Sequence, residues 1–197
     1  MTFNIRGFFL KTTCLVLVAS SFLFCDKKKI TANEIVSKSI DAHGGFNQWK
    51  QIDTLSFVKK TVLFTKKGLK EKEIKQYQSF SLGSSFNGAI TSLGSDSTSL
   101  TLTNGLYSKS IGDSLLVVTE KELPALKNAF KAAYYVVSQP FNLRESTASL
   151  LYVKDTVLKN KKTYVVNVSY KGDTENSDLW TYYFDAQTFL VVACKVY

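Results

Sequence analysis

The sequence predicts an α+β protein, with a large curved antiparallel sheet or half-open β-barrel covered by an N-terminal helix and a mid-chain helix. Alternating apolar and polar residues, separated by turn residues, fill most of 54–110 and 148–197. Helical periodicity is confined to residues 31–45 and 119–141, so the strand–helix–strand alternation of a parallel sheet is missing. A hydrophobic content of 45% with 21% charged residues is globular composition.

Residues 1–24 form a segment of their own, which we interpret as a secretory signal peptide. Arg6 and Lys11 precede the uncharged run 12–24, and this order is typical of such peptides. The run is shorter than the roughly 20 apolar residues that a membrane-spanning helix needs. An uncleaved transmembrane helix is therefore the weaker interpretation.

Two cleavage sites compete at the end of this segment. Ala19-Ser20-Ser21 fits an ordinary signal peptidase, whereas Cys25, followed by an acid and three lysines, resembles a bacterial lipoprotein processing site. Phe24 departs from the small residue usual before such a cysteine, but the position of Cys25 favours the lipoprotein type. We therefore expect Cys25 to be the lipid-attached mature N-terminus, with 25–30 as a basic tether.

This assignment predicts an exported protein anchored in a membrane of the cell envelope, on the periplasm-facing side or in the outer membrane. Lys27 to Lys29 would add attraction to anionic headgroups of about 1 kcal/mol per charge. The net charge of the whole chain is +9, and residues 25–197 keep +7 once Arg6 and Lys11 are removed. The lysines are scattered over turns and do not form a stripe interleaved with aromatics, so we predict no nucleic-acid partner.

The segment ITANEIVSKSIDAHGG, residues 30–45, predicts the first helix. Thr31 can cap it with Glu34 three residues later as a capping box, and Gly44 or Gly45 can end it in the left-handed conformation. His43, the single histidine of the chain, falls in the last turn, where an imidazole can bond a free carbonyl. We interpret His43 as a helix terminus, and we predict no catalytic residue.

A second helix is predicted within 119–141, with Thr119 as its cap and Pro140 as its limit. The Ser/Thr-rich stretch 79–103 keeps regularly spaced apolar residues, so it predicts strands with one solvated face. The last segment predicts two strands joined at 185–188, and Cys194 within it is expected to be a small buried hydrophobe.

Aromatic and β-branched residues of the late strands share one face, because successive strand residues point to opposite sides. This face, together with the tryptophan that follows the first helix, is the candidate lining of an interior cavity. The candidates are Trp49, Tyr164, Val166, Val168, Trp180, Tyr182 and Phe184. The same residues would serve equally as a filled core, and the sequence leaves both interpretations open.

Several stretches together resemble a known family: a helix ending in HGG, a tryptophan soon after it, LSF, QPFNL, and YVVNVSY followed by DLWTYYFDAQT. The chain from 31 to 197 is similar to uncharacterised exported proteins, common in Bacteroidota, that are related to the LolA/LolB lipoprotein-carrier fold. The resemblance implies a single LolA-like domain, a half-open barrel whose helices cover a cavity for acyl chains or another apolar ligand. It carries no catalytic residues. Members of that family usually continue beyond a strand such as LVVACKVY, so C-terminal truncation is one interpretation.

We therefore expect a membrane-anchored, non-catalytic envelope protein that binds a lipid or another hydrophobic small molecule, without cofactor or metal. The loop GDTENSD gathers acids but lacks the spacing of a calcium loop. Two alternatives stay open. One is a hydrolase, or another enzyme, built on carboxylates in the barrel mouth. The other is a structural envelope protein with a filled core.

Overall fold

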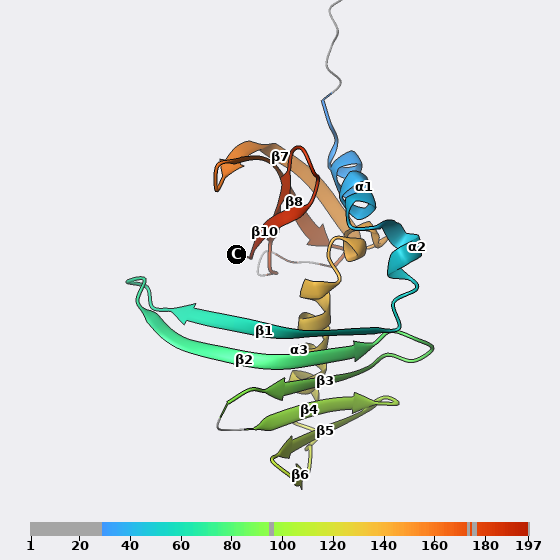
Figure 1. The fold of residues 1–197 in the computed structure, drawn as a ribbon, viewed down its shortest axis with the longest axis vertical. Helices are drawn as coiled ribbons and strands as arrows, with labels where there is room; N and C mark the ends of the chain where they lie inside the picture. The colour runs from blue at the N-terminus through green and yellow to red at the C-terminus, as the bar shows by residue number, and fades with distance from the viewer. Residues whose placement is uncertain (1–28, 95–96, 173, 175–176, 197) are drawn as a thin grey trace, which may run out of the picture.

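A computed structural model describes residues 29–94, 97–172, 174 and 177–196, and every structural statement below concerns these residues. The predicted signal peptide and Cys25 lie outside them. The described chain forms two antiparallel sheets, one above the other in Figure 1, with helices beside and between them.

The first helix, α1 (Ala32–Ala42), begins and ends where the sequence predicts. Thr31 and Glu34 form the capping box: the Thr31 hydroxyl accepts from the Glu34 N–H at 3.2 Å, and the Glu34 carboxylate accepts from the Thr31 N–H at 2.8 Å. Gly44, at a φ of +99°, turns the chain into the short helix α2 (Gly45–Trp49). The predicted helix boundaries are therefore confirmed.

The larger sheet is a meander in which each strand pairs with the next in the sequence. Its strands are β1 (Thr54–Phe64), β2 (Lys70–Ser81), β3 (Asn87–Ser92), β4 (Thr98–Thr103), β5 (Leu106–Ile111) and β6 (Ser114–Leu116). Tight turns join them, and Asn104-Gly105 between β4 and β5 has positive φ at both residues, as a two-residue hairpin turn requires.

One face of this sheet is solvated, as the Ser/Thr-rich sequence predicts. Hydroxyl pairs cross it between neighbouring strands: Ser56 with Ser79, Thr91 with Ser99, and Thr101 with Ser108. The opposite face is apolar and is covered by α3 (Leu123–Val137). The core between them consists of Phe80, Ile90, Leu102, Phe130 and Ala133.

After α3, the short helix η1 (Phe141–Arg144) leads into the second sheet. Its strands, in spatial order β10-β9-β8-β7, are β7 (Ala148–Leu158), β8 (Lys161–Tyr170), β9 (Trp180–Asp185) and β10 (Val191–Val196). One face of this sheet packs against α1 and η1. That core consists of Ala32, Ile35, Val36, Ile40, Phe141, Leu143, Val166, Val168, Tyr182 and Phe184.

The turn after β9 is organised by the carboxylate of Asp185. The buried Asp185 carboxylate accepts the backbone N–H groups of Gln187 at 2.9 Å and Thr188 at 3.0 Å. These bonds, with a smaller contribution from Lys161 3.5 Å away, lower the pKa of Asp185 below its ordinary value. Asp185 is thus part of the turn that joins the last two strands, as predicted for 185–188.

The α+β class is confirmed, but the strands form two sheets in place of one continuous curved sheet, and the described strands do not close into a barrel. The reason is the position of α3, which separates β6 from β7 and leaves each sheet with its own helix and core. Sequence patterns also miss β6 and η1, and α3 begins at Leu123, a turn later than expected from Thr119. Within the described part of the chain, no helix is long and apolar enough to span a membrane.

Gly88 in β3 lets α3 approach the sheet, which yields a test of the larger core. A Cβ at Gly88 would lie 2.9 Å from Phe80 Cδ1 and 3.1 Å from Phe130 Cε1, and both rings are buried. We expect Gly88→Ala to lower the free energy of unfolding by about 1–3 kcal/mol through overpacking, measured by urea denaturation. Gly83→Ala, where nothing lies within 4 Å, is the control. Equal stability of the two variants would contradict this packing.

Candidate functional site

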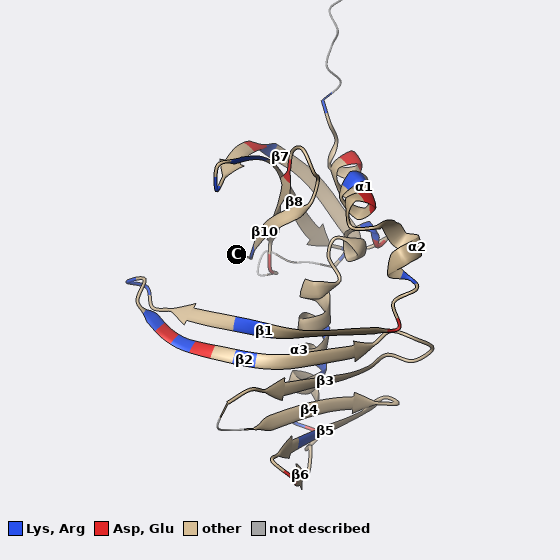
Figure 2. Cartoon of the chain, viewed as in Figure 1, with Lys and Arg blue, Asp and Glu red and all other residues tan. Residues whose placement is uncertain are grey.

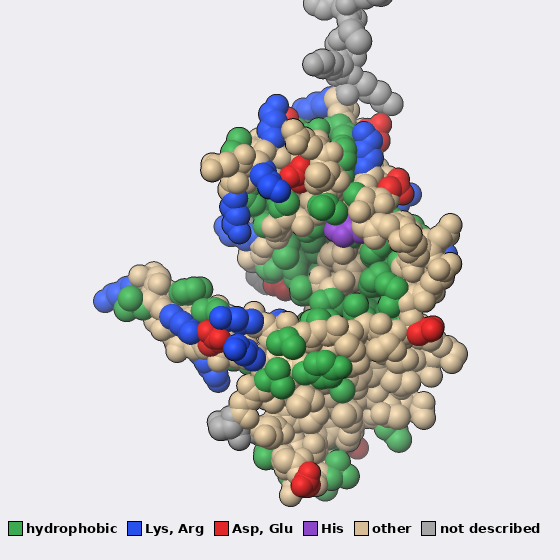
Figure 3. Space-filling view, in the orientation of Figure 1, with side chains coloured by type: hydrophobic (Ala, Val, Ile, Leu, Met, Phe, Trp, Pro, Cys, Tyr) green, Lys and Arg blue, Asp and Glu red, His purple; other side chains and the backbone are tan. Residues whose placement is uncertain are grey.

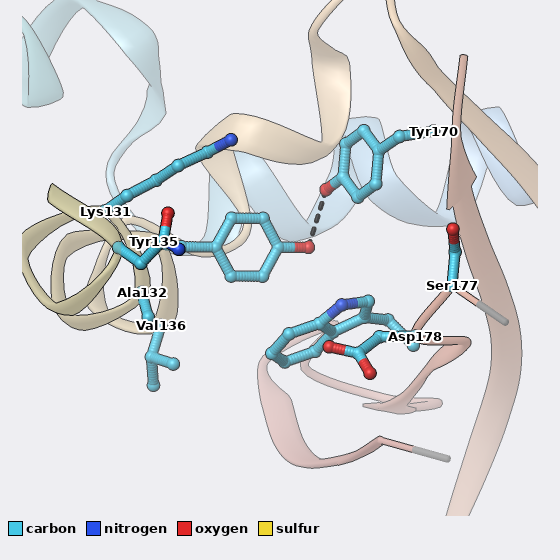
Figure 4. Close-up of a pocket in the computed structure, with 9 residues that line it drawn as sticks. Lys131, Ala132, Tyr135, Val136, Tyr170, Ser177 and Asp178 are labelled. Atoms are coloured by element: carbon cyan, nitrogen blue, oxygen red, sulfur yellow. Dashed lines mark hydrogen bonds between the residues drawn. The ribbon is translucent and has the colours of Figure 1, made fainter. Parts of the chain in front are cut away.

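A pocket of about 580 Å³ lies between α3 and the facing ends of β8 and β9 (Figure 4). Five residues come from α3 and four from the second sheet and the loop between β8 and β9. The pocket is lined by Asn128, Lys131, Ala132, Tyr135, Val136, Tyr170, Ser177, Asp178 and Trp180. Its volume falls within the range of about 300–1,000 Å³ usual for ligand pockets.

The helix α3 reaches this pocket with a second face. Residues 128, 131, 132, 135 and 136 follow the helical spacing of one stripe, while Phe130 and Ala133 point into the core of the larger sheet. Tyr134 and Tyr135 illustrate the division. The Tyr134 ring packs edge-on against Phe80 of the first sheet, whereas Tyr135 turns to the second sheet.

Three tyrosine hydroxyls meet at the inner wall of the pocket. The Tyr135 and Tyr170 hydroxyl oxygens are 2.6 Å apart (Figure 4), and the Tyr182 hydroxyl donates to Tyr135 at 3.2 Å. The Trp180 ring lies 4.7 Å from that of Tyr135, centroid to centroid. Because the hydroxyls bond to one another, the wall presents mainly the faces and edges of aromatic rings.

Burial raises the pKa of two tyrosines in this cluster. The pKa of Tyr135 is raised well above its ordinary value, with burial as the largest cause. The hydrogen bond with Tyr170 partly offsets that shift, and the bond from Tyr182 adds to it. The pKa of Tyr182 is likewise raised, again chiefly by burial. Both side chains therefore stay neutral phenols at pH values above the ordinary range for tyrosine ionisation.

Charged groups stand only at the rim. Lys131 and Asp178 are exposed, and Asp178 is the single carboxylate among the described residues that line the pocket. A second pocket of about 490 Å³ lies on the other side of Lys131 and Tyr135, and it too has one described carboxylate, Glu145. Neither pocket brings two described carboxylates together, as the hydrolase alternative would require.

The seven residues proposed from sequence as cavity lining lie in different environments. Val166, Val168, Tyr182 and Phe184 are at most 1% exposed and are packed under α1. The Trp49 ring stacks on Phe141 at 4.4 Å, and the Tyr164 ring lies 5.9 Å from that of Phe189. Trp180 alone of the seven lines the 580 Å³ pocket. A ligand-binding role for the set stays a prediction.

His43 lies where the sequence analysis placed it. It is the C-cap residue of α1, and its Nδ1 lies 2.7 Å from the Ser39 carbonyl oxygen. Among the described residues, no three His, Cys, Asp or Glu side chains gather as a metal site would need. Residues 173, 175 and 176 of the acidic loop lie outside the description.

The expectation of a buried Cys194 is wrong. Its side chain is exposed, since β10 is the edge strand of the second sheet. It lies opposite Tyr182 in the register, so it sits on the same face as the tyrosine cluster.

Comparison with known proteins adds a family to this geometry. A family model matches residues 9–197, and its description is a family of unknown function, DUF6503. The chain belongs to this family. No curated protein matches the sequence significantly.

Three solved structures containing MucB resemble the chain distantly. The complex of Pseudomonas aeruginosa MucA and MucB has a TM-score of 0.36 and 13% identity, and the match covers 84% of this chain and 50% of that one. MucB in complex with MucA(peri) has a TM-score of 0.33 and 12% identity, and the match covers 84% of this chain and 48% of that one. MucB has a TM-score of 0.34 and 14% identity, and the match covers 80% of this chain and 53% of that one. The chain thus spans about half the length of the MucB chains.

The buried tyrosines of this DUF6503 member predict a pH dependence of stability. Tyrosines of the unfolded chain ionise near pH 10, whereas Tyr135 and Tyr182 ionise higher in the folded state. Their contribution is therefore complete below pH 10 and is lost as the pH rises above it, at up to about 1.4 kcal/mol per pH unit and per tyrosine.

We expect the double variant Tyr135→Phe/Tyr182→Phe to lose less of its free energy of unfolding than the parent between pH 10 and 11.5, in urea denaturation series. Tyr77→Phe changes an exposed tyrosine outside the cluster and is the control. Parallel pH profiles for the double variant and the parent would contradict the burial of these hydroxyls.

Proposed function

We propose that this chain is a non-catalytic protein of the cell envelope that binds a lipid or another hydrophobic small molecule in the pocket between α3 and β8–β9. One observation carries the proposal. A pocket of about 580 Å³ is walled by Tyr135, Tyr170 and Trp180, with Ala132 and Val136 beside them. Apolar surface buried there would supply affinity at about 25 cal/mol per Å².

The polar groups of the pocket support the same ligand class. Tyr135 and Tyr170 share a hydroxyl hydrogen bond, and Tyr135 also accepts from Tyr182, so the two tyrosines that line the pocket leave mainly apolar ring surface for a ligand. Lys131 and Asp178 at the rim would suit a molecule whose polar head stays near solvent. An acyl chain or another elongated apolar molecule with a polar end has this chemistry.

The site proposed here differs from the cavity inferred from the strand pattern alone. Space under α1 is occupied by Ile35, Val36 and Ile40, against Val166 and Tyr182. That filling favours the structural-protein alternative for this half of the molecule. The pocket between the second face of α3 and the ends of β8 and β9 is open, so we place the ligand in this pocket.

Export and anchoring complete the proposal. The arrangement of Arg6, Lys11 and the run 12–24 supports a signal peptide, and Cys25 would then carry the lipid, followed by the tether 25–30. The protein would lie on the periplasm-facing side of its membrane or in the outer membrane. Mass spectrometry of the mature N-terminus, purified from host membranes, tests this part by the presence or absence of acyl groups on Cys25.

Native mass spectrometry of the protein from its own host tests the binding function. A stoichiometric apolar molecule, identified after denaturing extraction, is the expected result. A folded protein that carries no such molecule and takes up none from added lipids would contradict the proposal.

Filling the pocket provides a matched test by substitution. Ala132 and Ala125 are both exposed residues of α3, but only Ala132 lines the pocket. We expect Ala132→Trp to weaken binding of a fluorescent fatty acid about tenfold or more, which corresponds to about 1.4 kcal/mol, while Ala125→Trp leaves the Kd unchanged. Equal affinities in fluorescence titrations of both variants would place any binding elsewhere.

A further inference from the structure

The β1–β2 hairpin extends beyond the sheet as a two-stranded arm. Strand β3 pairs with β2 from Gln76 to Ser81, and the Leu93 N–H adds a bond to the Lys75 carbonyl, so Lys70–Ile74 pairs with β1 alone. Figure 1 shows the arm curving away from the other strands toward the left of the view. An isolated two-stranded ribbon is marginally stable in water, so its length calls for a reason.

The end of this arm combines exposed apolar side chains with lysines. Leu63, Phe64 and Leu69 are 43%, 62% and 66% exposed. Lys66 and Lys67 stand between Phe64 and Leu69, and the stretch from 54 to 70 holds five lysines and no acid. A group of exposed apolar side chains beside lysines is typical of an interaction surface.

Of the two acids that follow in β2, Glu73 is already paired with other lysines. The Glu73 carboxylate forms ion pairs with the Lys70 Nζ at 2.5 Å and the Lys60 Nζ at 3.1 Å. Hydrogen bonds from Lys70 and Lys60 lower the pKa of Glu73 to about 2. Lys66 and Lys67 are exposed and make no ion pair with the described residues. Their charge is available to a partner.

A second hairpin tip has the same composition. The β7–β8 turn at Lys159 and Asn160 is flanked by Val157, which is 67% exposed, and by Lys162, while Lys161 lies 3.5 Å from the Asp185 carboxylate. Figures 1 and 2 show both tips projecting to the same side of the molecule, each with lysines at its end. Figure 3 shows hydrophobic side chains beside the lysines of the β1–β2 arm.

We propose that the β1–β2 and β7–β8 turns dock this protein on an anionic lipid surface. Phe64, Leu69 and Val157 would enter the boundary between headgroups and acyl chains, while the neighbouring lysines contact lipid phosphates. A purely charged partner would leave these apolar side chains in water, so the composition favours a surface that offers both charge and hydrocarbon. The inference does not rest on the ligand pocket.

Hydrogen–deuterium exchange of the full chain on lipid vesicles tests the docking. One sample uses vesicles of phosphatidylcholine alone, and the other adds phosphatidylglycerol. An N-terminal anchor, either the run 12–24 or a lipid on Cys25, meets the same hydrocarbon in both samples, so a difference between them reports the headgroup charge. We expect exchange in 62–70 and 157–162 to slow about tenfold on the anionic vesicles only, and this protection to disappear in 1 M salt.

Charge reversal supplies the variants. Lys66→Glu/Lys67→Glu should abolish the protection of 62–70, whereas Lys121→Glu/Lys127→Glu makes the same change at exposed lysines near the start of α3 and should preserve it. Protection that is equal on neutral and anionic vesicles, that survives the Lys66/Lys67 reversal, or that falls on other surfaces overturns the proposal. Binding of a fluorescent fatty acid by the Lys66/Lys67 variant should match the parent, which separates this test from the pocket.

Discussion

The relative position of the two sheets depends on a group of hydroxyls centred on Tyr135. Its helix is fixed on the larger sheet through Phe130 and Ala133, and Tyr135 reaches across to Tyr170 and Tyr182 of the smaller one. A buried hydroxyl without a partner costs about 1–3 kcal/mol. Sliding one sheet along the other would separate these hydroxyls, so their bonds restrict the arrangement more narrowly than apolar contact alone does.

This constraint also explains where the pocket forms. Each sheet has a helix that covers it closely: α3 packs on the larger sheet and α1 on the smaller one. Side chains fill both of these layers. At the junction, the ring of Tyr135 bridges the gap between α3 and the ends of β8 and β9, and short side chains such as Ala132 leave space beside it. The pocket is thus a consequence of joining two separately packed halves.

Local signals made most secondary structure predictable from the sequence. Thr31 and Glu34 specify a helix start, Asn104-Gly105 a hairpin turn, and the alternation at 164–170 one buried strand face. The division into two sheets depends on which strands pair with one another. The alternation of apolar and polar residues along a strand does not specify its partner. The site was missed for a related reason. The sequence pattern of α3 shows one apolar stripe, which includes Tyr134 but not Tyr135. Because neighbouring helix residues point about 100° apart, Tyr135 faces a second partner that this stripe does not predict.

The walls of the pocket belong to both halves of the molecule, and this has a thermodynamic consequence. A ligand in contact with Ala132 on α3 and Trp180 on β9 binds only when the two sheets keep their native orientation. Ligand binding would then stabilise that orientation by a free energy that grows with the logarithm of the ligand concentration relative to Kd. The α1 core is linked to the pocket through Tyr170 and Trp180, which pack against it, whereas Phe130 and Ala133 of the α3 core are not among the lining residues. Stabilisation by ligand would therefore act first at the junction around Tyr135, where hydroxyl bonds join α3 to β8 and β9.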